Sequence, residues 1–423
     1  MRFIADLHIH SKYSRATSRD MTPESIGKWA QLKGISVVGT GDFTHPEWLR
    51  ELQQKLEIAE NSLFRLRKEF RTGDVPPLCR AQVFFLLTAE ISCIYSKNGR
   101  VRKIHSLLLA PDFSAAAKVN AALSRIGNLS SDGRPILGLD AKNLLEIVLD
   151  IGPDIMLVPA HAWTPHFSVF GASSGFDTLE ECFEELTPHI CAIETGLSSD
   201  PSMNWRISAL DRVTLLSNSD AHSPAKLGRE ANIFDAGLSY GEILDSIRTR
   251  KGFLGTIEFF PEEGKYHFDG HRACGIIFSP RETIRNKHRC PICGKRVTVG
   301  VLHRVEKLAD REAGYQPEGA PPFRSVIPLQ ELLAETLKKG VNTKTVQNEY
   351  ERLLRKLGNE FAILMDIPQD VLGREGSPVL GEAIRRMRRG DISISPGFDG
   401  EYGKIKIFEA VTRQVSKGQT MLF

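Results

Sequence analysis

Residues that commonly bind metal ions recur at the ends of apolar segments in the first 250 residues, and this recurrence constrains the fold more than any other feature. The first instance is Asp6-Leu7-His8-Ile9-His10. Alternate residues of an extended strand point to the same face, so Asp6, His8 and His10 share one face. Two imidazoles at the end of a strand provide half of a metal site. The alternative, a pair of surface histidines near a terminus, is disfavoured by the downstream pattern.

Apolar strands alternate with helices through this region. Thr22 and Pro23 predict a helix start, as N-cap and first helical residue, and Gly34 predicts its end. Strands are expected at 35–38, 83–88, 104–109, 155–159, 190–194, 213–216 and 252–256, and helices at 46–70, 141–150, near 177–186 and at 240–250. Short strand–helix–strand links are typical of parallel βαβ units. We therefore expect an α/β barrel rather than a Rossmann sheet, because no Gly-rich phosphate loop follows the first strand.

Histidine and acidic residues follow most of these strands. They are Asp6, His8, His10, Asp42, Glu90, His105, His161, Asp220 and His222. Mixed imidazole and carboxylate ligands suit zinc, manganese or iron. Each residue alone could be a satisfied buried histidine or a helix-capping acid, but nine together predict two or three divalent ions with bridging carboxylates. Such clusters hydrolyse phosphate esters.

Composition is that of a globular protein with two or three domains. The 423 residues are 41% hydrophobic and 25% charged, and a net charge of +3 neither requires nor excludes a nucleic-acid partner. The absence of a signal-peptide pattern and of a long apolar run predicts a cytoplasmic location and no membrane partner. Seven cysteines, an odd number, argue against a disulfide framework.

The spacing Cys290-Pro-Ile-Cys293-Gly is typical of a zinc knuckle. Cys274 is a third ligand, and the fourth must come from another residue type. His271 has suitable spacing from Cys274, with His267 and His288 as alternatives. We expect one structural zinc ion that stabilises a segment too small to form its own core.

The remaining chain is expected to be mainly helical. A linker at Gly314–Pro328 is followed by helices at 329–339, 344–366 and 379–389 and a hairpin at 392–408. This pattern divides the chain into a barrel (1–257), a zinc-binding module (258–312) and a C-terminal helical region with a terminal hairpin (313–423).

Basic residues cluster near the zinc knuckle and on one C-terminal helix. They are Arg272, Arg281, Arg285, Lys287, Arg289, Lys295, Arg296, His303, Arg304 and the run Arg385–Arg389. They could contact phosphates or form a solvated charged face. Gln419–Phe423 loosely resembles a sliding-clamp peptide, although a disordered tail is the simpler interpretation.

Six motifs in order resemble those of the polymerase and histidinol phosphatase (PHP) family. They are D-L-H-I-H, G-T-G-D, A-E-I-S, K-I-H-S-L-L-L, P-A-H-A-W and S-N-S-D-A-H, within residues 1–255. The resemblance implies a distorted (β/α)7 barrel with a trinuclear metal cluster. His8, His10, Glu90, His105, His161, Asp220 and His222 match the family ligands, and we assign catalysis to Asp220, His222 and Glu90.

This chain departs from the family pattern at two places. Thr40-Gly41-Asp42 replaces the common T-D-H, which puts Asp42 at a histidine position, and Ala16 occupies a site where some members have a further histidine. One metal ion is therefore expected to be bound differently or more weakly.

Motifs outside the barrel resemble the endonuclease Q family of PHP-barrel repair nucleases. They are Y-H-F-D-G-H-R-x-C-G from Tyr266, C-P-x-C-G from Cys290, V-G-V-L-H-R-V-E from Val299 and G-F-D-G-E-Y-G from Gly397. The resemblance implies incision of DNA on the 5′ side of hypoxanthine, uracil, xanthine or an abasic site. Alternatives are a small-molecule phosphatase with an accessory zinc domain and a non-catalytic DNA-tethering module.

An enzyme of this kind must extrude the lesion into a pocket. Aromatic residues in the loop after His161 could stack on a base, with core packing as the alternative for each. They are Trp163, Phe167, Phe170 and Phe176.

Overall fold

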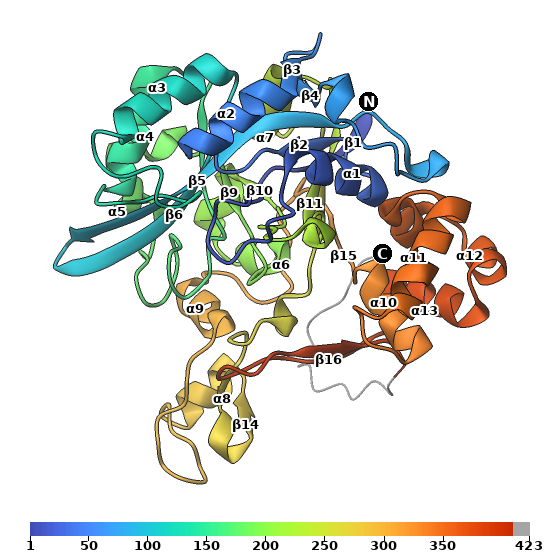
Figure 1. Cartoon of the computed structure of the whole chain (residues 1–423). Coiled ribbons are helices and arrows are strands. Elements are labelled where there is room, and N and C mark those ends of the chain that lie inside the picture. Colours follow the sequence, from blue (N-terminus) through green and yellow to red (C-terminus); the bar gives the residue numbers. More distant parts are fainter. Residues whose placement is uncertain (409–423) are drawn as a thin grey trace.

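One large mixed sheet forms most of the barrel in the computed structural model, which describes residues 1–408 (Figure 1). Its strands follow the order β15-β12-β11-β1-β2-β5-β6-β8, and β9 and β10 pair separately. The strands are β1 (Arg2–Asp6), β2 (Val37–Gly39), β5 (Phe84–Lys97), β6 (Arg100–Ala110), β8 (Met156–Pro159), β9 (Ala192–Glu194), β10 (Thr214–Leu216), β11 (Ala231–Asp235), β12 (Phe253–Glu258) and β15 (Phe323–Ser325).

The expected α/β fold with a distorted barrel is confirmed. The distortion has two sources. β6 is antiparallel to both β5 and β8, and β11 is antiparallel to β1 and β12. In Figure 1 the β5–β6 hairpin extends well beyond the rest of the sheet.

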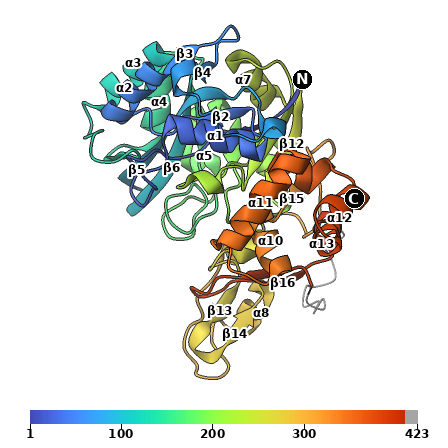
Figure 2. The same cartoon turned by 45° about the vertical axis from the view of Figure 1, so that its right-hand side comes forward.

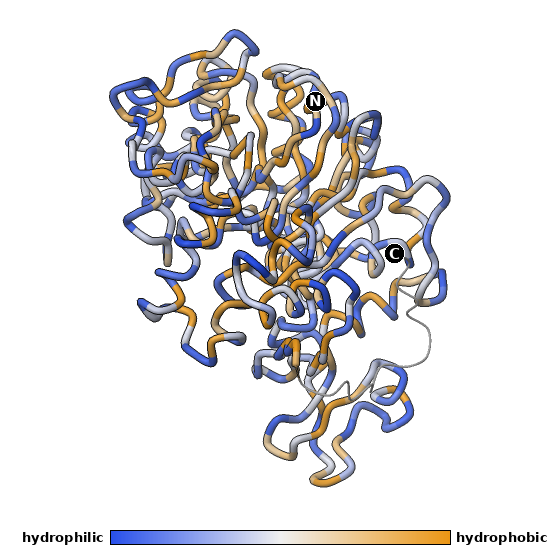
Figure 3. The backbone as a smooth tube through the Cα atoms, turned by 90° about the vertical axis from the view of Figure 1, so that its right-hand side faces the viewer, coloured by the Kyte–Doolittle hydropathy of each residue, from blue (hydrophilic) through white to orange (hydrophobic). Residues whose placement is uncertain are grey.

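Helices cover the outside of the barrel, and apolar residues of both layers form its core. The helices are α1 (Pro23–Lys33), α2 (Pro46–Lys55), α3 (Phe113–Leu123), α4 (Ala141–Ile151), α5 (Leu179–Phe183), α6 (Pro201–Asn204) and α7 (Tyr240–Thr249). In Figure 3 hydrophobic segments run through the middle of the barrel and hydrophilic ones mark many surface loops. Helix α1 begins and ends as predicted: Thr22 accepts a hydrogen bond from the Ser25 amide, and Gly34 adopts a φ of 90°.

One sequence prediction of secondary structure was wrong, and two elements were not predicted. The helix expected at 46–70 ends at Lys55, and a hairpin of β3 (Leu56–Ile58) and β4 (Phe64–Leu66) follows. Its alternating apolar residues have the period of a strand. Strand β11 and helix α12 (Gln369–Glu375) were not predicted from the sequence.

Side-chain amides join β10 to β11, where no strand ladder forms within the described chain. The side chain of Asn232 in β11 accepts from the Ser217 amide at 2.9 Å and donates to the Ser217 carbonyl at 2.8 Å. It also donates to the side chain of Asn218, which accepts from the Leu7 amide. Asn232 is fully buried. These contacts satisfy backbone groups that a strand partner would otherwise pair.

The zinc-knuckle segment extends away from the barrel (Figure 1) and has strands and helices of its own. These are β13 (Asp269–His271), β14 (Ile276–Phe278), α8 (Pro280–Arg285) and α9 (Val301–Leu308), while the short β7 (Ile136–Leu137) belongs to the barrel. The segment is tied to the barrel by buried Arg304, which donates to the carbonyls of Phe170 and Phe176 at 2.9 Å. Its position relative to the barrel therefore depends on α9.

The C-terminal helices pack beside α1 (Figure 2) and share a hydrophobic core with the barrel. They are α10 (Leu329–Leu337), α11 (Lys344–Leu357), α12 and α13 (Pro378–Arg389). Lys33 and Glu360, each 3% exposed, form an ion pair of 2.7 Å at this interface. Tyr350 donates to the same carboxylate at 2.8 Å. Because a buried charge requires partners, this pair fixes how the helices dock on α1.

The terminal hairpin connects these helices to the zinc-knuckle segment. Strands β16 (Ser393–Ser395) and β17 (Lys404–Lys406) are antiparallel, which confirms the predicted hairpin. Its tip reaches the segment, where Asp399 accepts from the Arg272 amide at 2.7 Å and from Thr298 at 2.6 Å. The glycine-rich tip thus has a structural role in joining two parts of the chain.

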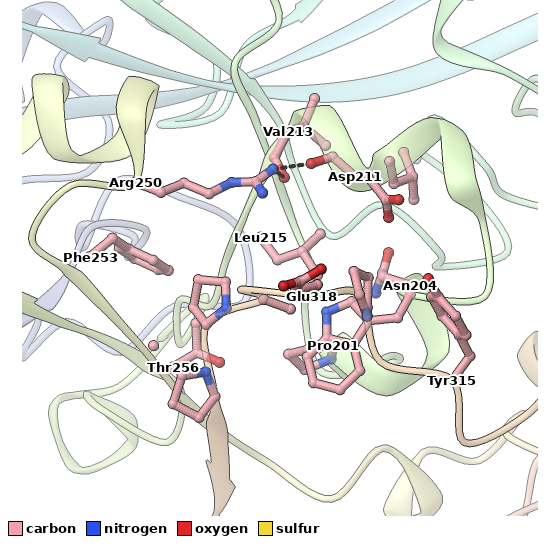
Figure 4. Close-up of a pocket in the computed structure, with 17 residues that line it drawn as sticks. Pro201, Asn204, Asp211, Val213, Leu215, Arg250, Phe253, Thr256, Tyr315 and Glu318 are labelled. Carbon is pink, nitrogen blue, oxygen red and sulfur yellow. Dashed lines mark hydrogen bonds between the residues drawn. The ribbon is translucent and has the colours of Figure 1, made fainter.

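The segment expected as a linker closes one side of the barrel. Its residues Phe323–Ser325 form β15, parallel to β12. Together with β10, β12 and α6 it encloses a pocket of about 170 Å³, shown in Figure 4, where Arg250 donates to the Val213 carbonyl at 2.6 Å. The pocket lies beside the barrel wall. No helix of the described chain has the length and apolar character needed to cross a membrane.

Replacing Asn232 by leucine should destabilise the protein. The substitution keeps the side-chain size but leaves the Ser217 amide and carbonyl without partners, so the free energy of unfolding should fall by about 2–4 kcal/mol. The midpoint of chemical unfolding measures this change. Asn342→Leu, at an exposed position, is the control and should have little effect. An unchanged midpoint for Asn232→Leu would contradict the role of this amide in joining the strands.

Candidate metal centre

The barrel brings six of the predicted residues into two adjacent groups. His8, His10 and Asp220 form one group, and Glu90, His105 and His161 form the other. Within each group the ligand atoms lie within 4.8 Å of one another. β1 carries the chain into His8 and His10, while β5 and β6 carry Glu90 and His105. His105 reaches the cluster because β6 is antiparallel and places it opposite Ser92 of β5.

Glu90 lies between the two groups, with one carboxylate oxygen toward each. Its Oε1 is 2.6 Å from His105 Nδ1 and 3.0 Å from His161 Nε2. Its Oε2 is 3.3 Å from His10 Nε2 and 3.7 Å from His8 Nε2. This is the arrangement expected of a carboxylate that bridges two metal ions.

The first group contains polar atoms that lack partners within residues 1–408. His8 Nε2, His10 Nε2 and Asp220 Oδ1 are buried and make no hydrogen bond of good geometry. Buried polar atoms are otherwise almost always paired. Three such atoms, two from the segment after β1 and one from the loop after β10, fit a divalent cation that would take all three as ligands.

The electrostatics of the cluster also favour a cation. Burial opposes a charge on His8, but Glu194 and Glu90 outweigh it and raise the pKa of its imidazole well above the usual value. Burial would likewise raise the pKa of Asp220, but the nearby imidazoles of His10 and His8 lower it below its usual value. The carboxylates thus attract positive charge to a site where a metal ion would supply it.

A second layer of residues orients the ligands. Glu194 contacts His8 Nδ1 at 2.9 Å and is itself held by the Asn218 side-chain amide at 2.8 Å. This contact directs His8 Nε2 toward the cluster, because the opposite ring nitrogen is engaged. The sequence analysis did not assign Glu194 to the site, although its place at the end of β9 is the same signal that identified the other residues.

Asp42 does not lie where the sequence analysis predicted. Its Oδ1 is 3.0 Å from His10 Nδ1, and its Oδ2 accepts from the Ser11 amide and hydroxyl at 2.6 Å and from Ser14. These contacts occupy the carboxylate on the outer side of His10. Gly41 has a φ of 64°, and a Cβ there would lie 2.4 Å from the Ile9 carbonyl oxygen. We therefore reassign Asp42 as a positioning residue for His10.

His222 and Asp6 lie at the edge of the site. His222 Nδ1 is 2.8 Å from the Asp220 carbonyl oxygen, and its ring centroid is 4.5 Å from that of His10. It belongs to neither group. Asp6 accepts from the amides of Ser219 and Gly228 at 3.0 and 2.9 Å, so it holds the Asp220 loop and lies outside the two groups.

Three site residues have a left-handed backbone that non-glycine residues rarely adopt. The φ angles of Asp42, His161 and Asp220 are 50°, 30° and 46°. Such conformations cost free energy and are concentrated at functional sites. Their occurrence at three separate strand ends supports a functional role for this end of the barrel.

The aromatic loop after His161 is mostly part of the core. Trp163, Phe170 and Phe176 are almost fully buried, so core packing explains them. Phe167 is partly exposed, and its ring centroid lies 4.6 Å from that of His105. It is the one of the four that remains a candidate for contacting a base.

The second predicted metal site is also assembled. His271, Cys274, Cys290 and Cys293 form one group, with His271 Nδ1 3.8 Å from Cys293 Sγ. His267 and His288 are not members of it. Three sulfurs and one imidazole match a structural zinc site, and the surrounding segment has few buried apolar residues of its own.

Several of the basic residues have structural partners. Arg281 pairs with Glu306 and Glu312, Arg385 and Arg386 pair with Glu382, and Arg388 donates to three carbonyls near residue 364. The C-terminal basic run is therefore largely an intramolecular feature. Exposed residues without such pairs remain on the knuckle, including Arg285, Lys287 and Lys295.

A buried carboxylate lies beyond Glu194 on the same side of the barrel. Glu258 accepts hydrogen bonds from Ser217 at 3.0 Å and from Thr195 at 3.3 Å and is fully buried. Burial raises its pKa to about 8, and nearby Asp200 acts in the same direction. The folded protein therefore favours the neutral acid at this position.

An α/β barrel with two groups of metal-ligand side chains is typical of metal-dependent hydrolases. Comparisons with known proteins identify the family to which the chain belongs. The lesion-specific endonuclease Q of Pyrococcus furiosus has a similar structure, with 32% identity, a TM-score of 0.84 and 96% of each chain covered. The structure of endonuclease Q with a 27-mer duplex carrying an abasic lesion at its active site gives 32% identity and a TM-score of 0.82, covering 98% of this chain and 100% of that one. The chain belongs to the endonuclease Q family, which confirms the resemblance inferred from its motifs.

Two proteins of unassigned function are related to the chain in sequence. The protein YqxK of Bacillus subtilis is 29% identical over 420 residues, which are 96% of this chain and 99% of that protein. The protein MJ0043 of Methanocaldococcus jannaschii is 34% identical over 253 residues, or 58% of this chain, and the match spans only 31% of its length. Residues 328–391 match the family model of the MJ0043 C-terminal domain.

Substitution of a knuckle cysteine should remove one metal ion and leave the barrel ions. Cys290→Ser is expected to lose about one equivalent of zinc, because it removes one of four ligands. Elemental analysis of the purified full-length protein measures this, and its thermal stability should also fall. Cys191→Ser, outside both sites, is the matched control. Loss of all bound metal in Cys290→Ser would contradict the division into two sites.

The raised pKa of Glu258 predicts that the stability of the folded protein depends on pH. In the unfolded chain its carboxyl loses a proton near the usual value of 4.5, whereas the folded protein holds the proton until about pH 8. Stability should therefore fall as the pH rises from 4.5 to 8. Glu258→Gln removes this effect, so its unfolding temperature should exceed that of the wild type at pH 8 but hardly at pH 5. The exposed control Glu60→Gln should show no such difference, and a constant gap for Glu258→Gln would contradict the prediction.

Proposed function

We propose that this protein is a DNA repair endonuclease that hydrolyses the phosphodiester on the 5′ side of a deaminated base or an abasic site. The observation that carries the proposal is the placement of Glu90 between two groups of metal-ligand side chains. Likeness over nearly the whole chain to endonuclease Q, including a complex with an abasic duplex, supports DNA as the substrate. Hypoxanthine, uracil and xanthine are the deaminated bases proposed from the family resemblance.

The two groups would hold two divalent ions, with a third near His222 as the upper limit. His8, His10 and Asp220 would bind one ion, and His105 and His161 the other, with Glu90 shared. Zinc, manganese, magnesium or iron are the candidate metals. When bound, such ions neutralise phosphate charge and lower the pKa of water.

Residues of the protein orient the histidine ligands and place a proton-accepting imidazole beside them. Glu194 and Asp42 hold the outer nitrogens of His8 and His10, so both imidazoles present Nε2 to the cluster. His222 directs Nδ1 to the Asp220 carbonyl, which leaves Nε2 able to accept a proton. Burial lowers the pKa of His222, so its neutral form predominates near pH 7. Asp220, His222 and Glu90 are therefore the proposed catalytic residues.

The parts outside the barrel would contact DNA at a distance from the metals. We divide the chain into a barrel (1–257), a zinc-binding module (258–312) and a C-terminal region (313–423). The exposed basic residues on the zinc-binding module are suited to phosphate contacts. Action on chromosomal DNA would place the protein with the nucleoid in the cytoplasm. The candidate clamp peptide Gln419–Phe423 lies outside the described residues, and clamp binding remains a proposal from sequence.

A labelled duplex with one abasic site or one deoxyinosine tests the proposal. In the presence of Mg²⁺ or Mn²⁺ the protein should nick immediately 5′ of the lesion. Asp220→Ala should slow this reaction by about 10²–10³-fold or more, because it removes a ligand of the first group. Asp245→Ala, which removes an exposed carboxylate of helix α7 outside both groups of ligands, is the control and should retain the wild-type rate.

Other outcomes would identify the competing functions. Turnover of a phosphate monoester without any nick would indicate a small-molecule phosphatase. Binding of the duplex without cleavage of either substrate would indicate a DNA-tethering module. Either result would overturn the proposed endonuclease activity.

A further inference from the structure

The segment Asp132–Pro135 holds an arginine against the metal cluster. The Gly133 amide donates to the Tyr13 carbonyl at 3.0 Å, and the Pro135 carbonyl accepts from the Ser92 amide of β5 at 3.0 Å. Asp132 accepts from the Arg134 amide at 3.1 Å. The backbone is thus anchored on both sides of Arg134.

Gly133 allows this segment to approach the site closely. A Cβ at this position would lie 2.3 Å from Asp42 Oδ2 and 2.4 Å from Ser14 Oγ. Those atoms belong to the network that orients His10. Any larger residue would displace either the network or the segment, so the glycine places Arg134 next to the first group of ligands.

The guanidinium of Arg134 points at Glu90. Its Nη1 donates to Glu90 Oε2 at 3.0 Å, and the side chain is 27% exposed. A guanidinium stays protonated in proteins, so the group is a permanent cation at the border between the cluster and solvent.

Most donors of this guanidinium are not used within the described chain. A guanidinium has five N–H donors in a planar fork, and residues 1–408 provide Arg134 with one side-chain acceptor, Glu90. The neighbouring Arg229 differs, because it donates to the carbonyls of Ser219 and Asp220. Lys103 lies over the ring of Phe167. Arg134 thus has free hydrogen-bonding capacity directly beside the bridging carboxylate.

The charges around Glu90 indicate that the unused N–H donors of Arg134 are available to bind an anion. Glu90 is already contacted by four imidazoles, and two divalent ions would more than balance Glu90 and Asp220. Glu90 then needs no further cation. A guanidinium beside two metal ions is repelled by their charge unless an anion binds between them. The forked N–H donors of the guanidinium match two oxygens of a phosphate.

We propose that Arg134 is a catalytic residue that binds a non-bridging oxygen of the scissile phosphate beside Glu90. The proposal rests on the phosphoesterase function proposed above and adds the residue that recognises the reacting group. The alternative is that Arg134 only positions Glu90.

Inorganic phosphate is the probe that separates these roles. Arg134→Gln in the metal-loaded full-length protein should bind phosphate about 10–100-fold more weakly than wild type, as expected for loss of a charge-assisted hydrogen bond. Calorimetric titration measures the affinity, and elemental analysis measures the metal content, which should be unchanged. Arg134→Lys keeps the charge without the fork and should give an intermediate affinity.

Arg15→Gln is the matched control. Arg15 pairs with Asp132 of the same segment at 3.2 Å, but its side chain is 81% exposed. This variant loses the same charge and should bind phosphate as the wild type does. Phosphate affinity of Arg134→Gln within about threefold of wild type would overturn the proposal. So would loss of barrel metal in that variant, because it would show that Arg134 acts only through Glu90.

The phosphate measurement does not depend on DNA cleavage. If the wild type fails to nick the lesion duplex but binds phosphate through Arg134, the proposed DNA substrate is wrong and the role of Arg134 is supported. If it nicks the duplex and Arg134→Gln has wild-type affinity and rate, the endonuclease function is supported and the role of Arg134 is wrong.

Discussion

The contact of Glu90 with four imidazoles is the interaction on which the site depends. A carboxylate buried at the centre of a barrel is costly unless cations or donors surround it. Here the surrounding groups come from β1, β6 and the loop after β8, so the strands must close around Glu90 for its charge to be compensated. Its two oxygens separate the ligands into two groups. A single buried side chain thus links the fold of the barrel to its capacity for hydrolysis.

Closing the barrel requires hydrogen-bond partners for buried backbone groups between β10 and β11. β10 and β11 are joined through the side chains of Asn232 and Asn218, and Asn218 also holds Glu194 behind His8. The same amides therefore satisfy backbone groups and orient a ligand. Farther out, the Lys33–Glu360 pair docks the C-terminal helices, and the hairpin around Asp399 connects them to the zinc-binding module. Three parts of the chain are in this way fixed relative to one metal centre.

Much of this was predictable from local patterns. The strand ends that carry His8, Glu90, His161 and Asp220 were identified because metal-binding residue types are rare in such repeated positions, and the knuckle cysteines have a characteristic spacing. Errors arose where the pattern was short or ambiguous. The alternating apolar residues of Leu56–Leu66 have the period of strands, although a helix was predicted there. The pattern of polar residues at strand ends placed Asp42 among the candidate ligands, whereas its carboxylate is turned to the outer side of His10.

The sequence by itself determined the alternation of strands and helices, the two sets of metal-binding residue types and the family to which they belong. These are local properties, set by residue type and spacing along the chain. Only the tertiary structure decided that Glu90 divides the ligands into two groups, that Asp42 and Glu194 orient histidines, and that Arg134 reaches the cluster from the segment before β7. These roles depend on contacts between residues 15 to 186 positions apart, and such contacts arise from the closure of the barrel rather than from any local pattern.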